Sequence, residues 1–336
     1  MAGRRALRFG RFAASAAAIL VVLAAFRPAA AAPLVPAGSI GLGPVVGSLN
    51  DLAMDYANQR LFVLEGAAGA VAVVDLGAGT VTQTLNGLSS PQGLARDPQD
   101  DRLYVSTGRG KLAVYEGRPL KQKPDLSIGP DLGAPRYDSG SERIYIASNR
   151  RKIAIVDTTH NKLWDSIRLD GVPGPLALED GGSRLFVGAA GDKRILIADR
   201  SNNKQIGSWS SGDNADAASL ALDEDAGRLL AAFRQPAGLA WFDLADGSVK
   251  GRVDTCAKPG EVIADGMRAR VYLTCDEGRI EVFQRAAGGS YARLGVVDTA
   301  PGATAALLVP SNGRLYLAVP AVGGHAAEIR VYAPGS

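Results

Sequence analysis

One short phrase of sequence recurs along the chain and constrains the fold more than any other feature. It is an arginine followed by three apolar residues, and successive copies are separated by 42, 41, 41, 44, 42 and 44 residues. The copies begin at Arg60, Arg102, Arg143, Arg184, Arg228, Arg270 and Arg314. A period of about 40 to 45 residues is typical of four-stranded propeller blades. The repeat therefore predicts an all-β protein, a seven-bladed β-propeller of four-stranded antiparallel blades.

Each repeat has the same order of strand signals around this marker arginine. An apolar strand ends in an acid five residues before the marker, and a turn-rich stretch joins the two. The acids are Asp55, Asp97, Asp138, Glu179, Asp223 and Asp265. We interpret each acid as a turn cap that faces the marker arginine in an exposed pair, which contributes ~0–1 kcal/mol. A third apolar strand and an amphipathic outer strand follow.

The two ends of the chain predict how the ring closes. The last repeat stops after its third strand, at Tyr332, whereas the strand-like segment 38–42 precedes the first marker without inner strands of its own. We expect this N-terminal strand to complete the last blade. Such pairing closes the ring and leaves no sheet edge exposed at the junction.

Two marker strands also resemble a known repeat. Leu103-Tyr104-Val105-Ser106-Thr107 and Ile144-Tyr145-Ile146-Ala147-Ser148-Asn149 are similar to the Tyr-Val-Thr-Asn core of the YVTN-repeat, surface-layer type β-propellers. The resemblance covers residues 38–336. It implies the propeller fold and, because the family includes many exported bacterial proteins, export from the cytoplasm. It implies a binding scaffold more readily than a particular reaction.

The N-terminus has the pattern of a secretory signal. Four arginines between positions 4 and 11 precede the apolar run 17–26, and small residues follow at 29–32. The run is too short to span a bilayer. We expect residues 1–31 to be a signal peptide, with a twin-arginine signal as the alternative to the general export route. We expect residues 32–336 to form a single periplasmic or secreted domain without a stable membrane span.

The positive charge of the whole chain belongs to this N-terminal segment. The chain contains 37 Lys and Arg against 34 Asp and Glu, a net charge of +3. Residues 1–31 hold five of the arginines and no acid, so the remainder has 32 basic and 34 acidic residues, a net charge of about −2. Nucleic acid is not expected as a partner, because its binding needs a concentrated positive field. We expect a monomer.

The two cysteines suggest one disulfide, as is usual in an exported chain. Cys256 enters the sixth repeat, and Cys275 ends the second strand of that repeat. In a meander these two positions lie at the same end of neighbouring strands. A redox pair or a pair of metal thiolates is the alternative, and no Cys-x-x-Cys motif or nearby histidine supports it.

Basic residues gather in the loops of one predicted face and form the first candidate site. We expect them to form a positive arc around the central opening, which binds a small anionic ligand or an acidic protein partner. The alternative is ordinary solvated loop charge. The predicted ligand-binding residues are Arg109, Lys111, Arg136, Arg150, Arg151, Lys152, Lys193, Arg194, Arg234 and Lys258.

Polar residues of the connections that enter the blades form the second candidate site. Carboxylate and amide oxygens suit Ca²⁺ or another divalent cation, and propeller hydrolases similar to lactonases use such a cation to polarise a lactone carbonyl. The spacing here is not diagnostic, so we predict no cofactor and a non-catalytic binding scaffold. A metal-dependent lactonase-like hydrolase is the alternative. Its ligands would come from Asn50, Asp51, Asn214, Asp216 and Glu261.

Overall fold

The structure is a computed structural model that describes residues 3, 32–45, 47–148 and 150–335. The predicted signal peptide, residues 1–31, lies outside the described residues apart from Gly3. Residues Ala32–Ser336 form one compact unit, and the following description concerns that unit.

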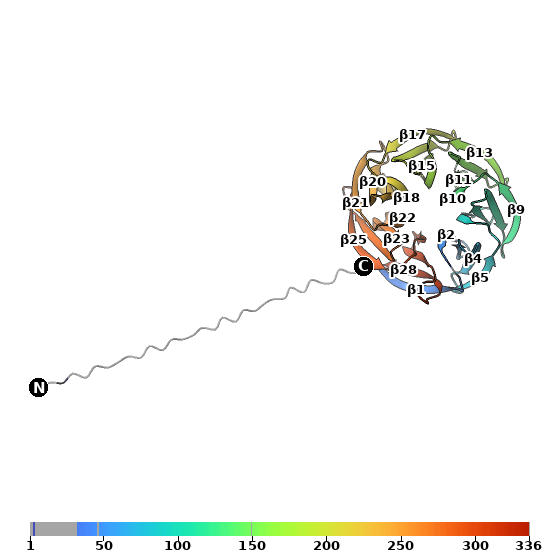
Figure 1. Ribbon diagram of the computed structural model, residues 1–336. Coiled ribbons are helices and arrows are strands. Elements are labelled where there is room, and N and C mark those ends of the chain that lie inside the picture. Colours follow the sequence, from blue (N-terminus) through green and yellow to red (C-terminus); the bar gives the residue numbers. More distant parts are fainter. Residues whose placement is uncertain (1–2, 4–31, 46, 149, 336) are drawn as a thin grey trace. The chain divides into compact units, whose positions relative to one another are not determined.

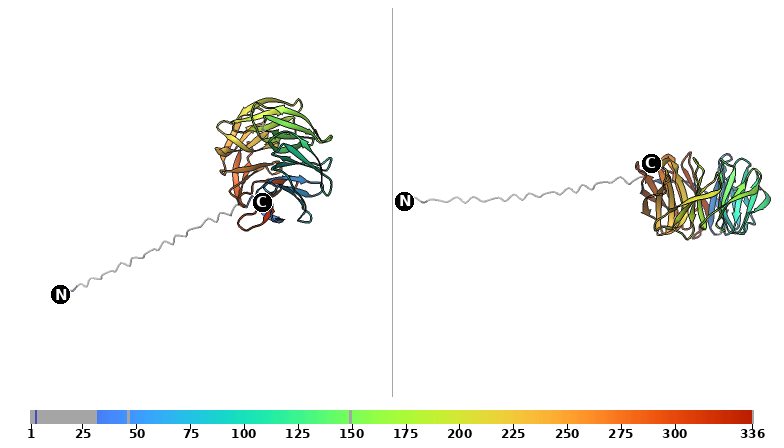
Figure 2. Two further views of the ribbon diagram at one scale, coloured as in Figure 1. Left: turned by 45° about the vertical axis from the view of Figure 1, so that its right-hand side comes forward. Right: turned by 90° about the horizontal axis from the view of Figure 1, so that it is seen from above.

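Seven four-stranded antiparallel sheets stand in a ring around a common axis (Figure 1). From the side, they stand next to one another as a disc (Figure 2). Blade 1 contains β2 (Leu49–Asp55), β3 (Arg60–Glu65), β4 (Ala70–Asp75) and β5 (Thr80–Leu85). Blade 2 contains β6 (Pro91–Asp97), β7 (Arg102–Thr107), β8 (Lys111–Glu116) and β9 (Lys121–Ser127). Blade 3 contains β10 (Leu132–Asp138), β11 (Arg143–Ser148), β12 (Lys152–Asp157) and β13 (Lys162–Arg168). Blades 4 and 5 contain β14 (Pro173–Leu178), β15 (Arg184–Ala189), β16 (Arg194–Asp199) and β17 (Lys204–Ser210); and β18 (Ala215–Asp223), β19 (Arg228–Gln235), β20 (Ala237–Asp243) and β21 (Val249–Asp254). Blade 6 contains β22 (Pro259–Asp265), β23 (Arg270–Cys275), β24 (Arg279–Arg285) and β25 (Tyr291–Asp298).

The seventh blade combines both ends of the unit. Its strand order is β1-β28-β27-β26, with β26 (Ala306–Val309), β27 (Arg314–Val319), β28 (Ala327–Pro334) and β1 (Leu34–Gly43). Strand β1 pairs antiparallel with β28, with Ile40 opposite Ile329. The predicted fold class and the predicted closure by the N-terminal strand are both confirmed.

The marker strands are core strands because each blade is covered on both faces by its neighbours. The aromatic rings of Phe62, Tyr104 and Tyr145 are fully buried. Phe62 and its blade 1 neighbours pack against Leu103 and Val105 of blade 2 in one apolar cluster. Strands buried on both faces read as continuous apolar runs, which is why the marker phrase has no polar alternation.

The interpretation of the repeat acids as turn caps is confirmed for Asp55, Asp97, Asp138 and Asp265, which accept hydrogen bonds from backbone N–H groups of their turns. The expectation that they are exposed and face their own marker arginine is wrong for most of the six. Asp55, Asp97, Asp223 and Asp265 are buried, with 0–3% of their surface exposed. Among the described residues, only Asp55 and Glu179 pair with the marker arginine of their own repeat. The next blade covers the turn and supplies other partners, as in the pairs Asp138–Arg200 and Asp223–Arg285.

The helical content of the described residues is two turns of three residues, Glu224–Ala226 and Gly266–Arg268. Across the same residues, no helix has the length and apolar character needed to cross a membrane.

Candidate functional site in the central channel

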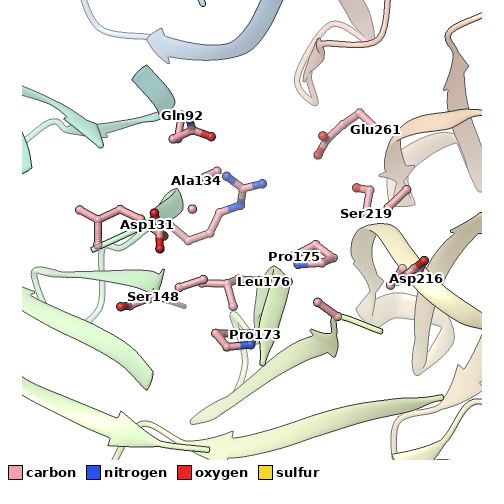
Figure 3. A pocket seen from close by; sticks show the side chains of 18 of the residues that line it. Gln92, Asp131, Ala134, Ser148, Pro173, Pro175, Leu176, Asp216, Ser219 and Glu261 are labelled. Carbon is pink, nitrogen blue, oxygen red and sulfur yellow. The ribbon is translucent and has the colours of Figure 1, made fainter. Parts of the chain in front are cut away.

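A cavity of about 590 Å³ lies among the innermost strands of blades 2 to 6. Each of these strands contributes to its lining, through Gln92 of β6, Arg136 of β10, Pro175 of β14, Ser219 of β18 and Glu261 of β22. Figure 3 shows Gln92 and Glu261 reaching into the same space from opposite sides. The cavity therefore collects side chains from positions up to 169 residues apart in the chain.

A repeated irregularity of the innermost strands directs side chains towards this channel. The pairing register shifts between Leu49 and Asp51 in β2, between Ala217 and Ser219 in β18, and between Pro259 and Val262 in β22. Strands β6, β10 and β14 shift at the corresponding place. A β-bulge redirects the side chains beside it. These residues thus lie within strands, and not in the connections where we expected Asp51, Asp216 and Glu261.

The repeat itself marks this wall position, although only the structure reveals its meaning. The position lies four residues before each repeat acid, and it holds Asp51, Gly93, Ala134, Pro175, Ser219 and Glu261 in blades 1 to 6. Four of these six are small or uncharged. Asp51 and Glu261 are therefore exceptions that carry charge to the wall. Ser219 was missed by the sequence reasoning, and comparison of the repeats at this position was the signal that could have found it.

Asp51 links two blades and also faces the channel charges. Its Oδ1 accepts a hydrogen bond from the backbone N–H of Leu52, and its Oδ2 accepts one from Leu94 of blade 2, both at 2.8 Å. Burial raises the pKa of Asp51, and the charge of Arg136 and the two N–H groups only partly oppose this. Asp51 consequently joins the innermost strands of blades 1 and 2. It also takes up a proton more readily than an ordinary aspartate.

Glu261, on β22 of blade 6, has the same electrostatic tendency. Burial raises the pKa of Glu261, and the negative charge of Asp51 raises it further. The positive charge of Arg136 and a hydrogen bond from Ser219 act in the opposite direction and only partly offset the rise. The Ser219 hydroxyl also accepts a hydrogen bond from the N–H of Val262 at 3.2 Å, which fixes its place beside Glu261. A protonated Glu261 carboxyl can donate a hydrogen bond into the cavity.

Two arginines supply the positive charge of the cavity. Arg136 and Arg234 both line it, and neither forms an ion pair with any described residue. Arg136 donates one hydrogen bond, from Nη1 to the carbonyl of Pro135 at 3.2 Å. The position of Arg136, two residues before its repeat acid, holds only apolar residues in the other six repeats. The guanidinium of Arg136 is therefore an individual feature of blade 3.

The structure divides the remaining residues of the predicted basic arc into two groups. Four of them form ion pairs with nearby acids: Lys111 with Asp125, Lys193 with Asp213, Arg194 with Asp170 and Asp192, and Lys258 with Asp276. Arg109 is exposed in the turn between β7 and β8. Arg150, Arg151 and Lys152 lie together at one end of blade 3 and away from the lining of the cavity.

The predicted metal ligands do not all reach the channel. Asn50 accepts a hydrogen bond from the hydroxyl of Ser48 at 2.8 Å. Asn214 is buried, donates to the carbonyl of Ser211 at 2.8 Å, and accepts from Arg252 at 3.0 Å. Asp216 and Glu261 line the cavity, and Asp51 lies near enough to influence the pKa of Glu261. The three carboxylates are not spaced to hold one metal ion together, and Asp51 and Glu261 are the two whose charges interact.

The two cysteines lie at disulfide distance. Their sulfur atoms are 2.14 Å apart, and they join the connection before β22 to the end of β23. Within the described residues, the single trio of side chains spaced to hold a metal combines these cysteines with the buried Glu281. The sulfur atoms in that trio are bonded to each other, so the metal-thiolate alternative does not describe this state.

Comparison with known proteins supports the fold and leaves the family open. No family model matches the chain, and no curated protein matches its sequence. The chain is similar in structure to a chain of hydrazine synthase from Kuenenia stuttgartiensis, with a TM-score of 0.72 and 13% identity over 83% of this chain and 94% of that chain. In all, 1801 chains of solved structures match this one. So widely shared a fold does not indicate one function.

Proposed function

We propose that the protein is an exported, non-catalytic binding propeller, periplasmic or secreted, that takes a small anionic ligand into its central channel. Arg136 carries the proposal. It is a guanidinium two residues before its repeat acid, at a place where each of the other six repeats has an apolar residue. It lines a cavity of about 590 Å³, and it has no ion-pair partner among the described residues. Arg234 adds a second cation to the same lining. Guanidinium groups suit carboxylate and phosphate oxygens.

The channel carboxyls support the same assignment. Because the pKa values of Asp51 and Glu261 are raised, these groups give up their charge more readily than ordinary acids and then donate hydrogen bonds. A ligand anion would then meet Arg136 and Arg234 beside the neutral carboxyl of Glu261, in a lining that also includes Asp131 and Asp216. Its affinity should increase as the pH falls through the raised pKa of Glu261.

Isothermal titration calorimetry with citrate and with inorganic phosphate tests this proposal. Arg136→Gln should weaken binding by about tenfold or more, which corresponds to the loss of one charge-assisted contact. Glu261→Gln keeps the neutral, hydrogen-bonding form and should leave anion binding in place. Arg109→Gln is the matched control, because Arg109 is exposed and does not line the cavity. Equal binding by Arg136→Gln and the unaltered protein would contradict the proposal.

The second candidate is a divalent cation held by the same carboxylates, as in a metal-dependent hydrolase of the lactonase type. The observation in its favour is the electrostatic coupling of Asp51 and Glu261, since each of two nearby carboxylates is stabilised by a bound cation. Its pH dependence is opposite to that of anion binding, because a cation binds the ionised carboxylates. Ca²⁺ should then stabilise the protein in thermal unfolding, more strongly as the pH rises, and Glu261→Gln should abolish the effect.

A further inference from the structure

A second cluster of positive charge lies at one end of blade 3, apart from the channel. It consists of Arg150 and Arg151 in the turn after β11, Lys152 at the start of β12, and Arg168 at the end of β13. None of these four side chains forms an ion pair with a described residue, and none lines the channel cavity. Arg151 donates to the backbone carbonyl of Asp170 at 3.4 Å, so its charge is not neutralised. We call these four residues the blade 3 basic cluster.

The cluster contains a cross-strand arrangement that works against the stability of its own sheet. Lys152 and Arg168 stand directly opposite each other in the β12–β13 ladder. Like charges in this arrangement repel and destabilise the pair. At the equivalent place, blade 2 pairs Lys111 with Ser127, and blade 6 pairs Arg279 with Asp298. Blade 3 therefore has a repulsive pair of cations where blades 2 and 6 have no like charges opposite each other.

A groove with a mixed polar and apolar lining adjoins the basic cluster. It has a volume of about 310 Å³, and its lining combines the cations Arg150 and Lys152 with the apolar Leu163 and Trp164 and with one acid, Asp165. The Asp165 carboxylate accepts hydrogen bonds from the N–H of Ser166 at 2.7 Å and from the amide of Asn203 at 2.9 Å. Leu163 and Trp164 are 45% and 42% exposed. The guanidinium of Arg143 lies 3.5 Å from the centre of the Trp164 ring, which holds the indole at the groove. Cations that form no ion pair with a described residue thus lie next to the accessible apolar side chains of Leu163 and Trp164.

We propose that this surface, the blade 3 basic cluster together with its groove, docks an extended acidic segment of a partner protein that carries an apolar residue among its carboxylates. Charge complementarity is the first reason, because the four cations lack described acidic partners. The groove is the second reason, because it offers an apolar residue a place beside Leu163 and Trp164. The proposal goes beyond the channel site and does not depend on it.

The geometry favours a peptide held by its side chains. The β12–β13 register shifts at Trp164, which leaves this residue in a bulge on the outer strand. A bulge interrupts an edge and hinders the addition of another strand. The cluster is also confined to one blade, in a unit whose net charge is about −2, whereas nucleic acid binding relies on an extended positive surface.

The test is fluorescence anisotropy with the purified protein and two labelled peptides, one of six glutamates ending in leucine and one in which glutamines replace the glutamates. We expect the glutamate peptide to bind, the glutamine peptide to bind at least about tenfold more weakly, and the affinity to fall steeply as salt increases. Trp164→Ala should weaken binding of the glutamate peptide by about threefold, since it removes apolar contact and no charge of the cluster.

Arg168→Glu separates loss of docking from loss of folding. The new acid would face Lys152, so repulsion would become attraction, and the thermal midpoint should rise by about 1 °C. Binding of the glutamate peptide should nevertheless fall by about tenfold or more. Arg109→Glu is the matched control, with the same change in net charge at an exposed residue outside the cluster. It should leave binding within about twofold of the unaltered protein.

Several results would overturn the proposal. One is unchanged binding in Arg168→Glu, and another is equal binding of the glutamine peptide. A third is failure of the glutamate peptide to bind when a twenty-residue oligothymidine or phosphatidylglycerol vesicles do bind, which would assign the cluster to nucleic acid or to membrane lipid. Because Arg136→Gln does not alter the cluster, loss of citrate binding there with intact peptide binding would leave this proposal standing.

Discussion

At the scale of single residues, the repeat acids show how burial changes the value of an ion pair. Asp55 is 3% exposed and accepts hydrogen bonds from Arg60, from Asn58 and from Arg96. Burial alone would raise the pKa of Asp55, but these hydrogen bonds and charges outweigh it and lower the pKa to about 2. Since this value lies below the ordinary value of 3.8, the carboxylate stabilises the fold above that pH, and its contribution is lost as the pH falls towards 2.

The first stability prediction concerns this residue. Asp55→Asn should lower the free energy of unfolding by about 2 kcal/mol at pH 7, because the nearly buried guanidinium groups of Arg60 and Arg96 then keep only Asp101 as a charged partner. The deficit relative to the unaltered protein should shrink as the pH approaches 2. Urea unfolding at several pH values measures it. Asp75→Asn is the control, because Asp75 caps only its own turn, at Gly77 and Ala78. A pH-independent deficit would contradict the electrostatic explanation.

At the scale of elements, four of the seven marker arginines connect their blade to the next. Arg60 of blade 1 reaches the carbonyl of Gly117 in blade 2 at 3.4 Å, and Arg102 of blade 2 reaches that of Thr158 in blade 3 at 2.6 Å. Arg184 and Arg270 make the corresponding contacts further along the ring. In these four blades the arginine of the repeated phrase therefore joins neighbouring blades at their outer turns. This role explains a charged residue at the head of a buried strand.

The disulfide of blade 6 gives a prediction at this scale. It closes a loop between positions 19 residues apart, and in the chain-entropy model such a link contributes about 3 kcal/mol. The double variant Cys256→Ala/Cys275→Ala should lower the free energy of unfolding by about that amount. Reduction with dithiothreitol should lower it similarly in the unaltered protein and have no effect on the variant. If the reductant destabilised both proteins equally, the link would not be the cause.

At the scale of the whole molecule, closure of the ring depends on one strand. Strand β1 covers the free edge of β28. It also inserts Ile40 and Leu42 into the apolar cluster between blades 7 and 1, and Leu34 into the cluster between blades 6 and 7. The backbone N–H of Gly335 donates to the carbonyl of Pro33 at 3.0 Å. The first and last described parts of this unit therefore lie side by side.

Deletion of residues 32–43 should open the ring. We expect the shortened protein to aggregate, because it exposes both the edge of β28 and the apolar residues that β1 covers. Size-exclusion chromatography and thermal unfolding measure this. In the matched control, a circular permutant joins residue 335 to residue 32 and begins between blades 1 and 2, at residue 87. It should remain monomeric and unfold cooperatively, because it keeps every strand pair. A monomeric, cooperative deletion variant would show that closure by β1 is dispensable.

The fold was accessible from sequence because strand patterns are local. The marker phrase needs only four residues to signal a buried strand, and its even spacing predicts the number of blades and their antiparallel order. The unmatched segment 38–42 and the missing fourth strand after Tyr332 even predicted the closure. Each of these signals lies within one repeat or follows from counting repeats.

The partners of the charges were decided only by the tertiary structure. Asp138 meets Arg200, and Asp223 meets Arg285, across 62 residues of sequence in each case. This pairing also decides which cations form no ion pair with a described residue, among them Arg136, Arg168 and Lys152. The physical reason is the ring itself. It brings equivalent positions of all repeats to one axis and packs each blade against the next, so the surroundings of a charge are set by residues one repeat or more away.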